Sequence, residues 1–374
     1  MSVRPKVLFV GAFPSADRRV YGGIVTSCAA LLRSDFPLRV ELELFDTTQV
    51  SNPPPPFLVR LLRAGPRFAR FLSRLERGRP DAVLIFVATG AGLVEKGAMA
   101  WYGRLRGVPV LMFPRGGAVM EACERSGFTR WWVRVAFRGA HTVLCQGESW
   151  RSFAQQTLGF DGARTPVVPN WTATEELLAV GRKRATRADG SLRLLFVGWL
   201  ERNKGVLELL QAFAVLASQF DVTLDIVGDG TLAPEVDRFS VEHGLQGVVR
   251  RRGWLEGDAL VHAFAAADVL VLPSYAEGLP NAMIEGMASG AAVVVSRVGV
   301  VPDVITHGRE GLLVEPRDVE SLVLALRRLA ENPMDMARMA LAGRALAEAR
   351  FAVAPAAAAI EAAIAAAVSP QRVE

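Results

Sequence analysis

The run VLVLPSYAEGLPNAMIEGMASGAAVVVS, residues 269–296, decides the fold of this chain. Its apolar segments at 270–272 and 291–296 are typical of short buried strands. Between them, a loop punctuated by glycine and proline leads into a helix of small residues, 282–289, which Gly290 is placed to end. The order strand, loop, helix, strand predicts a parallel α/β sheet.

Two carboxylates lie in this run, Glu277 and Glu285. If the helix begins near Pro280, Glu277 precedes its N-terminus and Glu285 lies more than a turn inside, so one ligand could contact both. Backbone N–H groups around Gly278 and Leu279, with the helix dipole, suit a phosphate or sugar oxygen. Carboxylates accept hydrogen bonds from paired sugar hydroxyls. The alternative is two solvated glutamates beside a capped helix, since exposure is the default for glutamate.

The downstream run VGVVPDVITHGREGLLVEPRD, residues 298–318, resembles the C-terminal signature of the GT4 family of retaining glycosyltransferases. That family carries two glutamates with seven residues between them, as Glu277 and Glu285 have here. It also carries a glycine-rich Pro-Asp/Glu segment, matched by 298–303, and a Gly-Leu-Leu-Val element, matched by 311–314. The resemblance implies the GT-B architecture, in which two Rossmann-like α/β domains face each other across an interdomain cleft.

The composition bounds the class of protein. A length of 374 residues suffices for two domains, and no apolar run is long enough to predict a membrane span. The N-terminal apolar run predicts a first strand rather than a signal peptide. The three cysteines, Cys28, Cys123 and Cys145, show neither metal-ligand spacing nor a disulfide framework, so we expect a reduced, cytoplasmic setting.

Charge is divided unevenly along the chain. Residues 1–185 hold 26 basic and 14 acidic residues, a difference of +12, whereas residues 186–374 hold 17 and 24, a difference of −7. The two halves are therefore expected to meet different partners.

The first predicted strand, 6–10, opens into a loop that ends at Gly22 and Gly23, where a helix is expected to begin. Glycines let backbone amides approach a phosphate closely, although a plain strand-to-helix turn explains the same pattern. The resemblance favours the first interpretation, because the family places this loop near the donor phosphates and the acceptor.

Arginines recur at spacings of three and four along 57–80, which predicts a basic stripe on an amphipathic helix that Gly65-Pro66 breaks or kinks. The stripe comprises Arg60, Arg63, Arg67, Arg70, Arg74 and Arg77. An anionic membrane surface is one candidate partner, and a solvated face of a packed helix is the alternative. No recognition module accompanies the stripe, so we expect no nucleic acid partner.

The strand predicted at 108–113 runs into Arg115-Gly116. Many GT4 relatives have a histidine before this glycine, facing the transferred sugar. A guanidinium stays protonated and is no general base, but it can bind a sugar hydroxyl, a phosphate or an acidic acceptor. We predict a structural role for His141, which lies in a further strand.

The second half repeats the order of strand, loop and helix, beginning with a strand at 192–197 and a loop at 198–205. The family has Gly-Arg-Leu, three variable residues and Lys-Gly here, with the arginine and lysine on the donor diphosphate. Lys204 keeps its place, Trp199 replaces the arginine, and Arg202 is a plausible substitute. The chain holds only four lysines against 39 arginines, so lysine here is a specific choice.

The turn at Gly228 resembles a dinucleotide-binding fingerprint. Nicotinamide binding requires a strand that ends in Asp or Glu about 20 residues later, and no such strand follows here. In GT4 proteins this turn lies on the donor side. Trp254 and Leu255 follow the next strand, where the family's backbone holds the nucleotide base.

The resemblance also implies the domain boundaries. An N-terminal, acceptor-side domain comprises 1–170 and 352–374, with the C-terminal helix crossing back, and a linker at 171–190 leads to the nucleotide-sugar-binding domain, 191–351. Residues 171–190 lose periodicity, which suits a linker.

By resemblance, the chain is a retaining hexosyltransferase that moves a sugar from a UDP- or GDP-linked donor to a glycan or lipid-linked acceptor in exopolysaccharide, lipopolysaccharide or glycolipid assembly. Glu277 and Arg115 are the predicted catalytic residues. The predicted donor-binding residues are Gly22, Gly23, Arg202, Lys204, Gly228, Trp254, Leu255, Gly278, Leu279, Asn281 and Glu285.

No Asp-x-Asp motif occurs, so we expect no metal and no cofactor. The expected location is the cytoplasm, with peripheral contact at the inner face of the plasma membrane. Two alternatives remain: a GT-B nucleotide-sugar epimerase or hydrolase, and a non-catalytic sugar-nucleotide-binding subunit. The second is motivated by the departures at Trp199 and Arg115.

Overall fold

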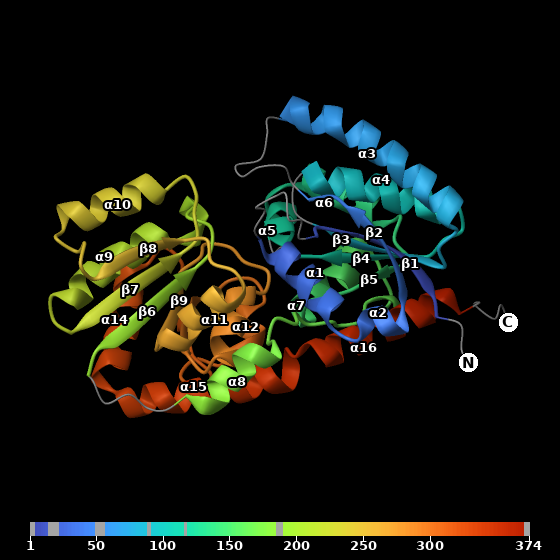
Figure 1. Cartoon of the computed structure of the whole chain (residues 1–374). Helices are drawn as coiled ribbons and strands as arrows, with labels where there is room; N and C mark the ends of the chain where they lie inside the picture. Colours follow the sequence, from blue (N-terminus) through green and yellow to red (C-terminus); the bar gives the residue numbers. More distant parts are fainter. Residues whose placement is uncertain are drawn as a thin grey trace. The chain divides into compact units, whose positions relative to one another are not determined.

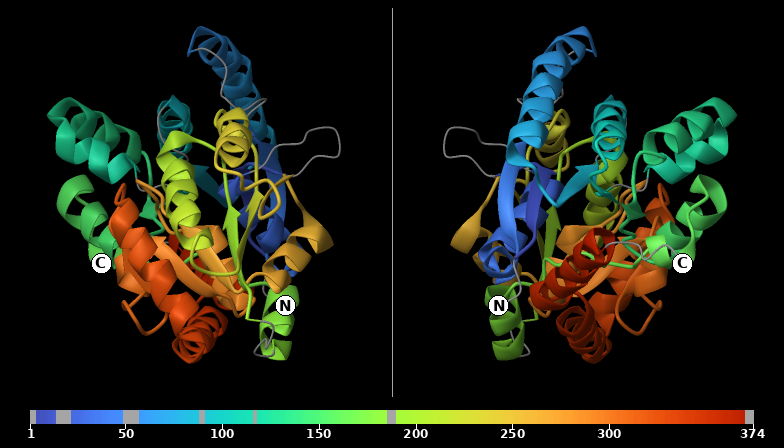
Figure 2. Two further views of the ribbon diagram at one scale, coloured as in Figure 1. Left: turned by 90° about the vertical axis from the view of Figure 1, so that its left-hand side faces the viewer. Right: turned by 90° about the vertical axis from the view of Figure 1, so that its right-hand side faces the viewer.

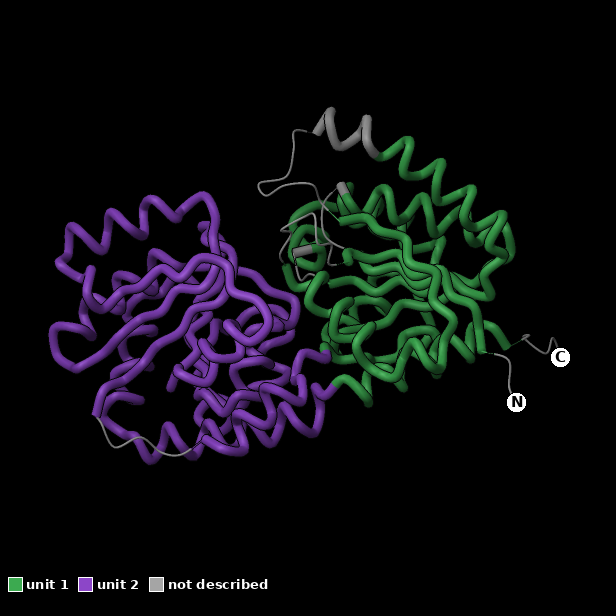
Figure 3. Tube along the Cα trace, in the orientation of Figure 1, with its two compact units in different colours: residues 1–170, 353–374 green, residues 171–352 purple. Residues whose placement is uncertain are grey.

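The computed structural model describes residues 4–13, 22–48, 57–87, 91–115, 118–184 and 190–369. The chain forms two compact units (Figure 3). Unit 1 comprises residues 1–170 and 353–374, and unit 2 comprises residues 171–352.

Unit 1 is built on a five-stranded parallel sheet in the order β2-β1-β3-β4-β5. The strands are β1 (Lys6–Gly11), β2 (Glu41–Asp46), β3 (Ala82–Val87), β4 (Val110–Pro114) and β5 (Thr142–Val143). Every residue of β3 and β4 is buried, as expected for strands covered on both faces. These central strands form the core of the unit.

Helices cover both faces of this sheet, with α3, α4 and α6 along one face and α1 and α16 along the other (Figure 1). Their bounds are α1 (Gly23–Arg33), α2 (Phe36–Arg39), α3 (Phe57–Gly78), α4 (Ala91–Leu105), α5 (Ala118–Arg125), α6 (Gly127–Phe137), α7 (Glu148–Phe153) and α16 (Val353–Val368). A π-helical turn, η1 (Ala154–Leu158), and a 3-10 turn, η2 (Gly162–Arg164), follow α7.

Gly65-Pro66 does not break the helix, because α3 continues as one element with Pro66 inside it. A proline removes one hydrogen bond of a helix but does not end it where packing supports both sides. Further along α3, Phe71 and Leu75 are buried in the unit, and this packing stabilises the helix.

Unit 2 is built on a six-stranded parallel sheet in the order β11-β10-β9-β6-β7-β8. The strands are β6 (Leu192–Val197), β7 (Val222–Val227), β8 (Val249–Gly253), β9 (Val269–Leu272), β10 (Ala292–Ser296) and β11 (Leu312–Val314). The helices are α8 (Glu175–Lys183), α9 (Val206–Ala217), α10 (Ala233–Glu242), α11 (Gly257–Ala266), α12 (Asn281–Ala288), α13 (Val301–Val304), α14 (Val319–Glu331) and α15 (Pro333–Arg350), with a 3-10 turn, η3 (Arg202–Lys204).

The chain in unit 2 leaves β6 toward β7 on one side and leaves β9 toward β10 on the other, although β6 and β9 are neighbours. The carboxyl ends of β6 and β9 therefore mark a topological switch point, where open α/β sheets bind ligands. Two parallel sheets covered by helices confirm the Rossmann-like fold class predicted from the sequence (Figure 2).

The helix α8 lies within 171–190, where the sequence, lacking periodicity, predicts a linker. Its N-cap is Thr174, whose side chain accepts a hydrogen bond from the N–H of Leu177. No helix among the described residues is both long enough and apolar enough to cross a bilayer.

Candidate active site

The loops that follow β6 and β9 meet at the switch point of unit 2. Lys204 ends η3 on the first loop, and Glu277 lies on the second, just before α12. Lys204 Nζ lies 2.6 Å from Glu277 Oε1, and both side chains are largely withdrawn from solvent. The structure thus brings together the cation predicted for the diphosphate and the carboxylate predicted for the sugar.

Several further contacts fix these two loops against each other. The N–H of Tyr275 donates to the carbonyl of Asn203 at 2.8 Å, and the hydroxyl of Tyr275 donates to Glu208 Oε1 at 2.5 Å. Gly205 adopts φ +67°, and a Cβ at this position would lie 2.1 Å from the carbonyl oxygen of Pro273. Only glycine fits there, which gives the Lys-Gly pair of the sequence a structural reason.

Glu285 lies on α12, whose first residue is Asn281 and whose N-cap is Pro280. Its side chain is buried, and burial raises the pKa of its carboxyl group to about 7. Among the described residues, none forms a hydrogen bond or ion pair with that carboxyl group. A buried carboxyl group without a partner, one helical turn behind a helix N-terminus, is suited to accept hydrogen bonds from a ligand.

The predicted loop at Gly278 and Leu279 is buried and is supported by the segment at 298–303. The carbonyl of Gly278 accepts a hydrogen bond from the N–H of Val300 at 3.0 Å. Arg202 lies on η3 beside Lys204 and is exposed, so its guanidinium is available to a ligand.

The turn after β7 closes against the loop after β6. Gly228 adopts φ +135°, and a Cβ there would lie 1.8 Å from the carbonyl oxygen of Gly198. The N–H of Leu200 also donates to the carbonyl of Asp229 at 2.9 Å. Gly228 therefore has a packing role at the edge of the predicted donor site.

Trp199, which stands where the family has arginine, packs edge-to-face on Trp254 with ring centroids 4.5 Å apart. This contact joins the loop after β6 to the segment after β8, where Trp254 and Leu255 are half-buried. The departure from the family pattern thus provides a wall of the region predicted for the nucleotide base.

In unit 1, Arg115 follows β4 directly. Its Nη2 donates to Ser27 Oγ on α1 at 2.5 Å, and its guanidinium carbon lies 4.9 Å from the ring centroid of Phe113. Burial lowers the pKa of Arg115 to about 10, so the side chain still carries its charge at neutral pH. Gly116, its predicted neighbour in the motif, lies outside the described residues.

Two further predicted residues of unit 1, Gly22 and Gly23, lie at the start of α1, as its N-cap and first residue. Ser27, the partner of Arg115, is one turn further along the same helix. The beginning of α1 and the end of β4 are therefore joined through one hydrogen bond.

Cys28 and Cys145 supply no thiolate nucleophile at neutral pH. Burial raises the pKa of Cys28 and of Cys145 to about 12, so both thiols stay protonated. Burial lowers the pKa of His141, whose Nδ1 pairs with the Thr142 hydroxyl. Among the described residues, no cluster of histidine, cysteine, aspartate and glutamate is suited to hold a metal ion.

Sequence reasoning missed Lys96 on α4. It is buried, and burial lowers its pKa to about 8, while the charges of Glu95, Arg67 and Asp46 act on it. The signal that singled out Lys204, a lysine in a chain that otherwise uses arginine, could have found this residue as well.

The arginine stripe of α3 is partly neutralised by the protein itself. Arg67 Nε lies 2.5 Å from Glu95 Oε1, and Arg74 Nη1 lies 2.9 Å from Glu43 Oε1. The side chains of Arg60 and Arg63 lie outside the described residues. The stripe therefore presents less positive charge than its sequence indicates.

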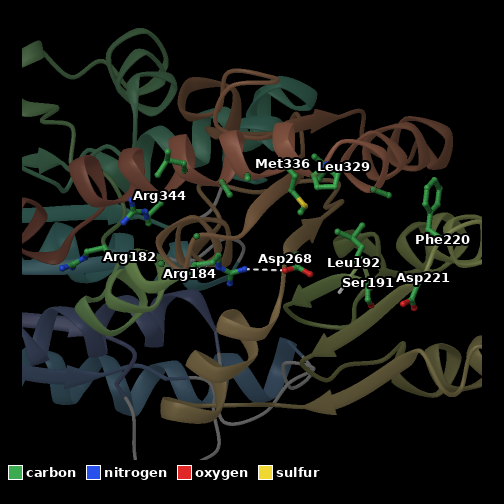
Figure 4. Close-up of a pocket in the computed structure, with 18 residues that line it drawn as sticks. Arg182, Arg184, Ser191, Leu192, Phe220, Asp221, Asp268, Leu329, Met336 and Arg344 are labelled. Atoms are coloured by element: carbon green, nitrogen blue, oxygen red, sulfur yellow. Dashed lines mark ion pairs between the residues drawn. The ribbon is translucent and has the colours of Figure 1, made fainter. Parts of the chain in front are cut away.

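A cavity of about 480 Å³ lies at the opposite edge of the unit 2 sheet, at the amino ends of β6 and β9 (Figure 4). Arg184 in its wall pairs with Asp268 at 4.0 Å and donates to the carbonyls of Ser289 and Phe264. These contacts tie α8 to its neighbours, so we assign this cavity to the packing of unit 2 rather than to the switch point.

Comparison with known families matches both halves of the chain. Residues 191–332 match the model described as "Glycosyl transferases group 1", and residues 24–171 match the "Glycosyl transferase 4-like domain". The MMP α-(1→4)-mannosyltransferase of Mycolicibacterium hassiacum is 26% identical over 321 residues, which cover 83% of this chain and 75% of that protein.

Two solved structures are similar in fold over almost the whole chain. Sucrose-phosphate synthase from Thermosynechococcus elongatus has a TM-score of 0.76 at 20% identity, with 96% of this chain and 97% of that chain covered. Anabaena HepE in complex with UDP and glucose has a TM-score of 0.71 at 20% identity, with 97% and 100% covered.

Proposed function

This chain belongs to the group 1, GT4-like glycosyltransferases, and from that premise we propose that it transfers a hexose from a UDP- or GDP-linked donor to a glycan or lipid-linked acceptor, with retention of configuration and without a metal ion. The observation that carries the proposal is the contact of Lys204 with Glu277 at the switch point, with Glu285 buried on the helix that follows, α12.

In the proposed donor complex, Glu285 accepts hydrogen bonds from the ribose hydroxyls, and Glu277 contacts the sugar. Lys204, Arg202 and the backbone amides of Gly278 and Leu279 neutralise the diphosphate, together with the N-terminus of α12. The negative charge on the leaving diphosphate grows as the glycosidic bond breaks. Fixed cations and amide dipoles stabilise that charge without help from a metal ion.

The acceptor is proposed to bind unit 1, which carries 24 basic and 14 acidic residues, a difference of +10. Arg115 is its proposed contact, since a protonated guanidinium can orient an acceptor hydroxyl or an acidic group but cannot remove a proton. An acidic glycan or a lipid-linked phosphate fits this charge. Such an acceptor places the reaction in the assembly of a polysaccharide or glycolipid.

Calorimetric titration with UDP, GDP and ADP, each with a chelator present, tests the donor half of the proposal. We expect one of the three to bind clearly, with UDP favoured because the similarly folded HepE holds UDP. Binding of none of them, or binding that requires added magnesium, would refute a metal-independent donor site. The anomeric configuration of the product, read by NMR once an acceptor is found, tests retention.

A further inference from the structure

Four large aromatic side chains of unit 1 are exposed on neighbouring helices, and we name them the aromatic face: Trp101 on α4, and Phe128, Trp131 and Trp132 on α6. Their exposed fractions are 43, 70, 57 and 43%. Phe128 stacks on Trp131, and Trp131 contacts Trp132, with ring centroids 6.2 and 5.7 Å apart. A contiguous apolar patch of this kind marks a surface that meets a partner.

The helix α6 already buries its other side in unit 1, through Val133, Ala136 and Phe137. The aromatic face is therefore not the side by which α6 packs on the core of unit 1. It is a second apolar side that the fold of unit 1 leaves open.

An apolar cavity of about 420 Å³ is lined by residues of α4, α5 and α6, among them the aromatic side chains. The described residues that line it include no charged side chain, and their polar groups are the Thr129 hydroxyl and the indole N–H groups of Trp101 and Trp132. The lining residues are Leu93, Val94, Gly97, Ala98, Trp101, Val119, Ala122, Phe128, Thr129, Trp132, Val133, Val135 and Ala136.

The floor of this cavity is tightly packed. A Cβ added at Gly97 would lie 2.8 Å from the Cβ of Ala136, so α4 and α6 approach as closely as their backbones allow. The Nε1 of Trp101 also donates to the carbonyl of Val135 at 2.7 Å. The cavity is thus part of the folded unit before any partner binds.

Arginines that pair with no carboxylate among the described residues surround the aromatic face. Arg104 donates to the carbonyl of Arg138 at 2.9 Å, Arg130 donates to the carbonyl of Cys123 at 3.1 Å, and Arg134 donates to the carbonyl of Thr157. Because a carbonyl carries no net charge, these guanidinium groups keep their full positive charge. Arg67 and Arg74 on α3, in contrast, face carboxylates.

The carboxylates near the aromatic face offset little of this charge. Glu121 pairs with Arg125 at 3.6 Å, and Glu95 pairs with Arg67. Glu124 is exposed beside Arg125. This one carboxylate is outnumbered by four exposed arginines, Arg104, Arg130, Arg134 and Arg138. The charge around the aromatic face is therefore positive.

We propose that the aromatic face docks on an anionic phospholipid bilayer. Tryptophan and phenylalanine side chains suit the boundary between headgroups and acyl chains, the arginines suit lipid phosphates, and the apolar cavity suits a segment of an acyl chain. A second copy of the chain fits poorly, since a symmetric contact would bring the two sets of arginines together. The proposal deepens the lipid-linked acceptor of the proposed function but does not depend on the donor site.

Flotation of the full chain with vesicles of phosphatidylglycerol and phosphatidylcholine tests this docking. We expect the wild type to float with the vesicles and the Phe128→Ser/Trp131→Ser/Trp132→Ser variant to lose at least tenfold in apparent affinity. The matched control is Leu324→Ser/Met334→Ser/Leu341→Ser, three exposed apolar residues of unit 2, which should float like the wild type. Arg130→Gln/Arg138→Gln should weaken binding to anionic vesicles and reduce its dependence on salt.

A second measurement needs only the wild type. Lipids brominated near the headgroup should quench its tryptophan fluorescence. Absence of quenching, or equal flotation of the aromatic variant and the wild type, would overturn the proposal. So would a vesicle-free wild type that sediments as a dimer while the aromatic variant sediments as a monomer. Nucleotide titration of the same variants separates this failure from failure of the donor site, since the aromatic face contains none of the predicted donor-binding residues.

Discussion

Lys204 Nζ and Glu277 Oε1, which lie 2.6 Å apart, neutralise each other across the switch point of unit 2. Each is therefore the other's partner while no ligand is bound, although they are proposed to contact different parts of the donor. A diphosphate that binds Lys204 must compete with Glu277 for the ammonium group. This competition makes the two residues respond differently to substitution.

Replacing Lys204 with alanine should remove a charge-assisted contact to the diphosphate and leave Glu277 without its partner. We expect kcat/KM to fall by about 100-fold, the order that a lost charged hydrogen bond and lost leaving-group stabilisation predict. Lys183→Ala, at an exposed lysine on α8, is the matched control and should retain wild-type kinetics. Equal kinetics for the two variants would remove Lys204 from the donor site.

Glu277→Gln should have opposite effects on binding and on turnover. The variant lacks the Glu277 carboxylate, so the Lys204 ammonium group has lost its partner and less negative charge lies near the diphosphate. The nucleoside diphosphate product should therefore bind more tightly, by about 3- to 10-fold. Turnover should fall at the same time, because the carboxylate that contacts the sugar is lost. Titration calorimetry and a steady-state assay on the same sample measure the two effects. Weaker product binding would contradict the proposed competition.

Much of the local structure was predictable because its signals are local. The run at 269–296 shows its strands and helix directly, and β9, α12 and β10 form where apolar runs and glycines indicate them. The helix α8 was predictable in principle, since Thr174 is an N-cap residue followed by two glutamates in the first turn. The apolar pattern of α8 is too short to show a helical period, so the sequence does not mark this segment as a helix by its periodicity.

The contacts that build the site were not predictable in this way. Lys204 and Glu277 are 73 residues apart in sequence, and only the neighbouring positions of β6 and β9 in the sheet bring them together. The packing of Trp199 on Trp254 depends likewise on the order of β6, β7 and β8. Sequence alone shows the tryptophan in place of arginine but not what it contacts.

Glu285→Gln should make the stability of the protein less dependent on pH. Burial raises the carboxyl pKa from 4.5 to about 7, so between these values the folded state binds more protons than the unfolded state. The free energy of unfolding therefore falls as pH rises from 4.5 to 7, and the glutamine variant lacks this loss. At pH 8 the variant should be more stable by up to about 3 kcal/mol, with no difference at pH 4.

Denaturant unfolding at both pH values measures this change, and nucleotide titration of the same variant is its functional counterpart. Because an amide offers one acceptor oxygen to the ribose hydroxyls, nucleotide affinity should fall while stability rises. A variant that is less stable than the wild type at pH 8 would show that the carboxylate has a stabilising partner after all.

Gly228→Ala should destabilise unit 2, since the added Cβ would lie 1.8 Å from the carbonyl of Gly198 at a φ that side chains rarely adopt. The expected cost is about 2–4 kcal/mol, the range for strain combined with overpacking. Gly247→Ala is the matched control, because a Cβ there meets no atom within 4 Å. Similar midpoints for both variants in thermal unfolding would mean that the turn after β7 relaxes easily.

Arg115→Ala should separate donor binding from transfer, because Arg115 is in unit 1 whereas Arg202 and Lys204, the predicted cationic contacts of the diphosphate, are in unit 2. We expect kcat to fall by about 100-fold with nucleotide affinity unchanged, the loss typical of one charged group that orients or stabilises a reacting centre. Arg115→Lys should recover only part of the rate, since an ammonium lacks the planar guanidinium that lies over the Phe113 ring. Ser27→Ala removes a hydrogen bond from the guanidinium to α1 but keeps the guanidinium, so its loss of rate should be smaller. If Arg115→Ala turns over at the wild-type rate, the guanidinium has a purely structural role, and acceptor contacts must come from elsewhere in unit 1.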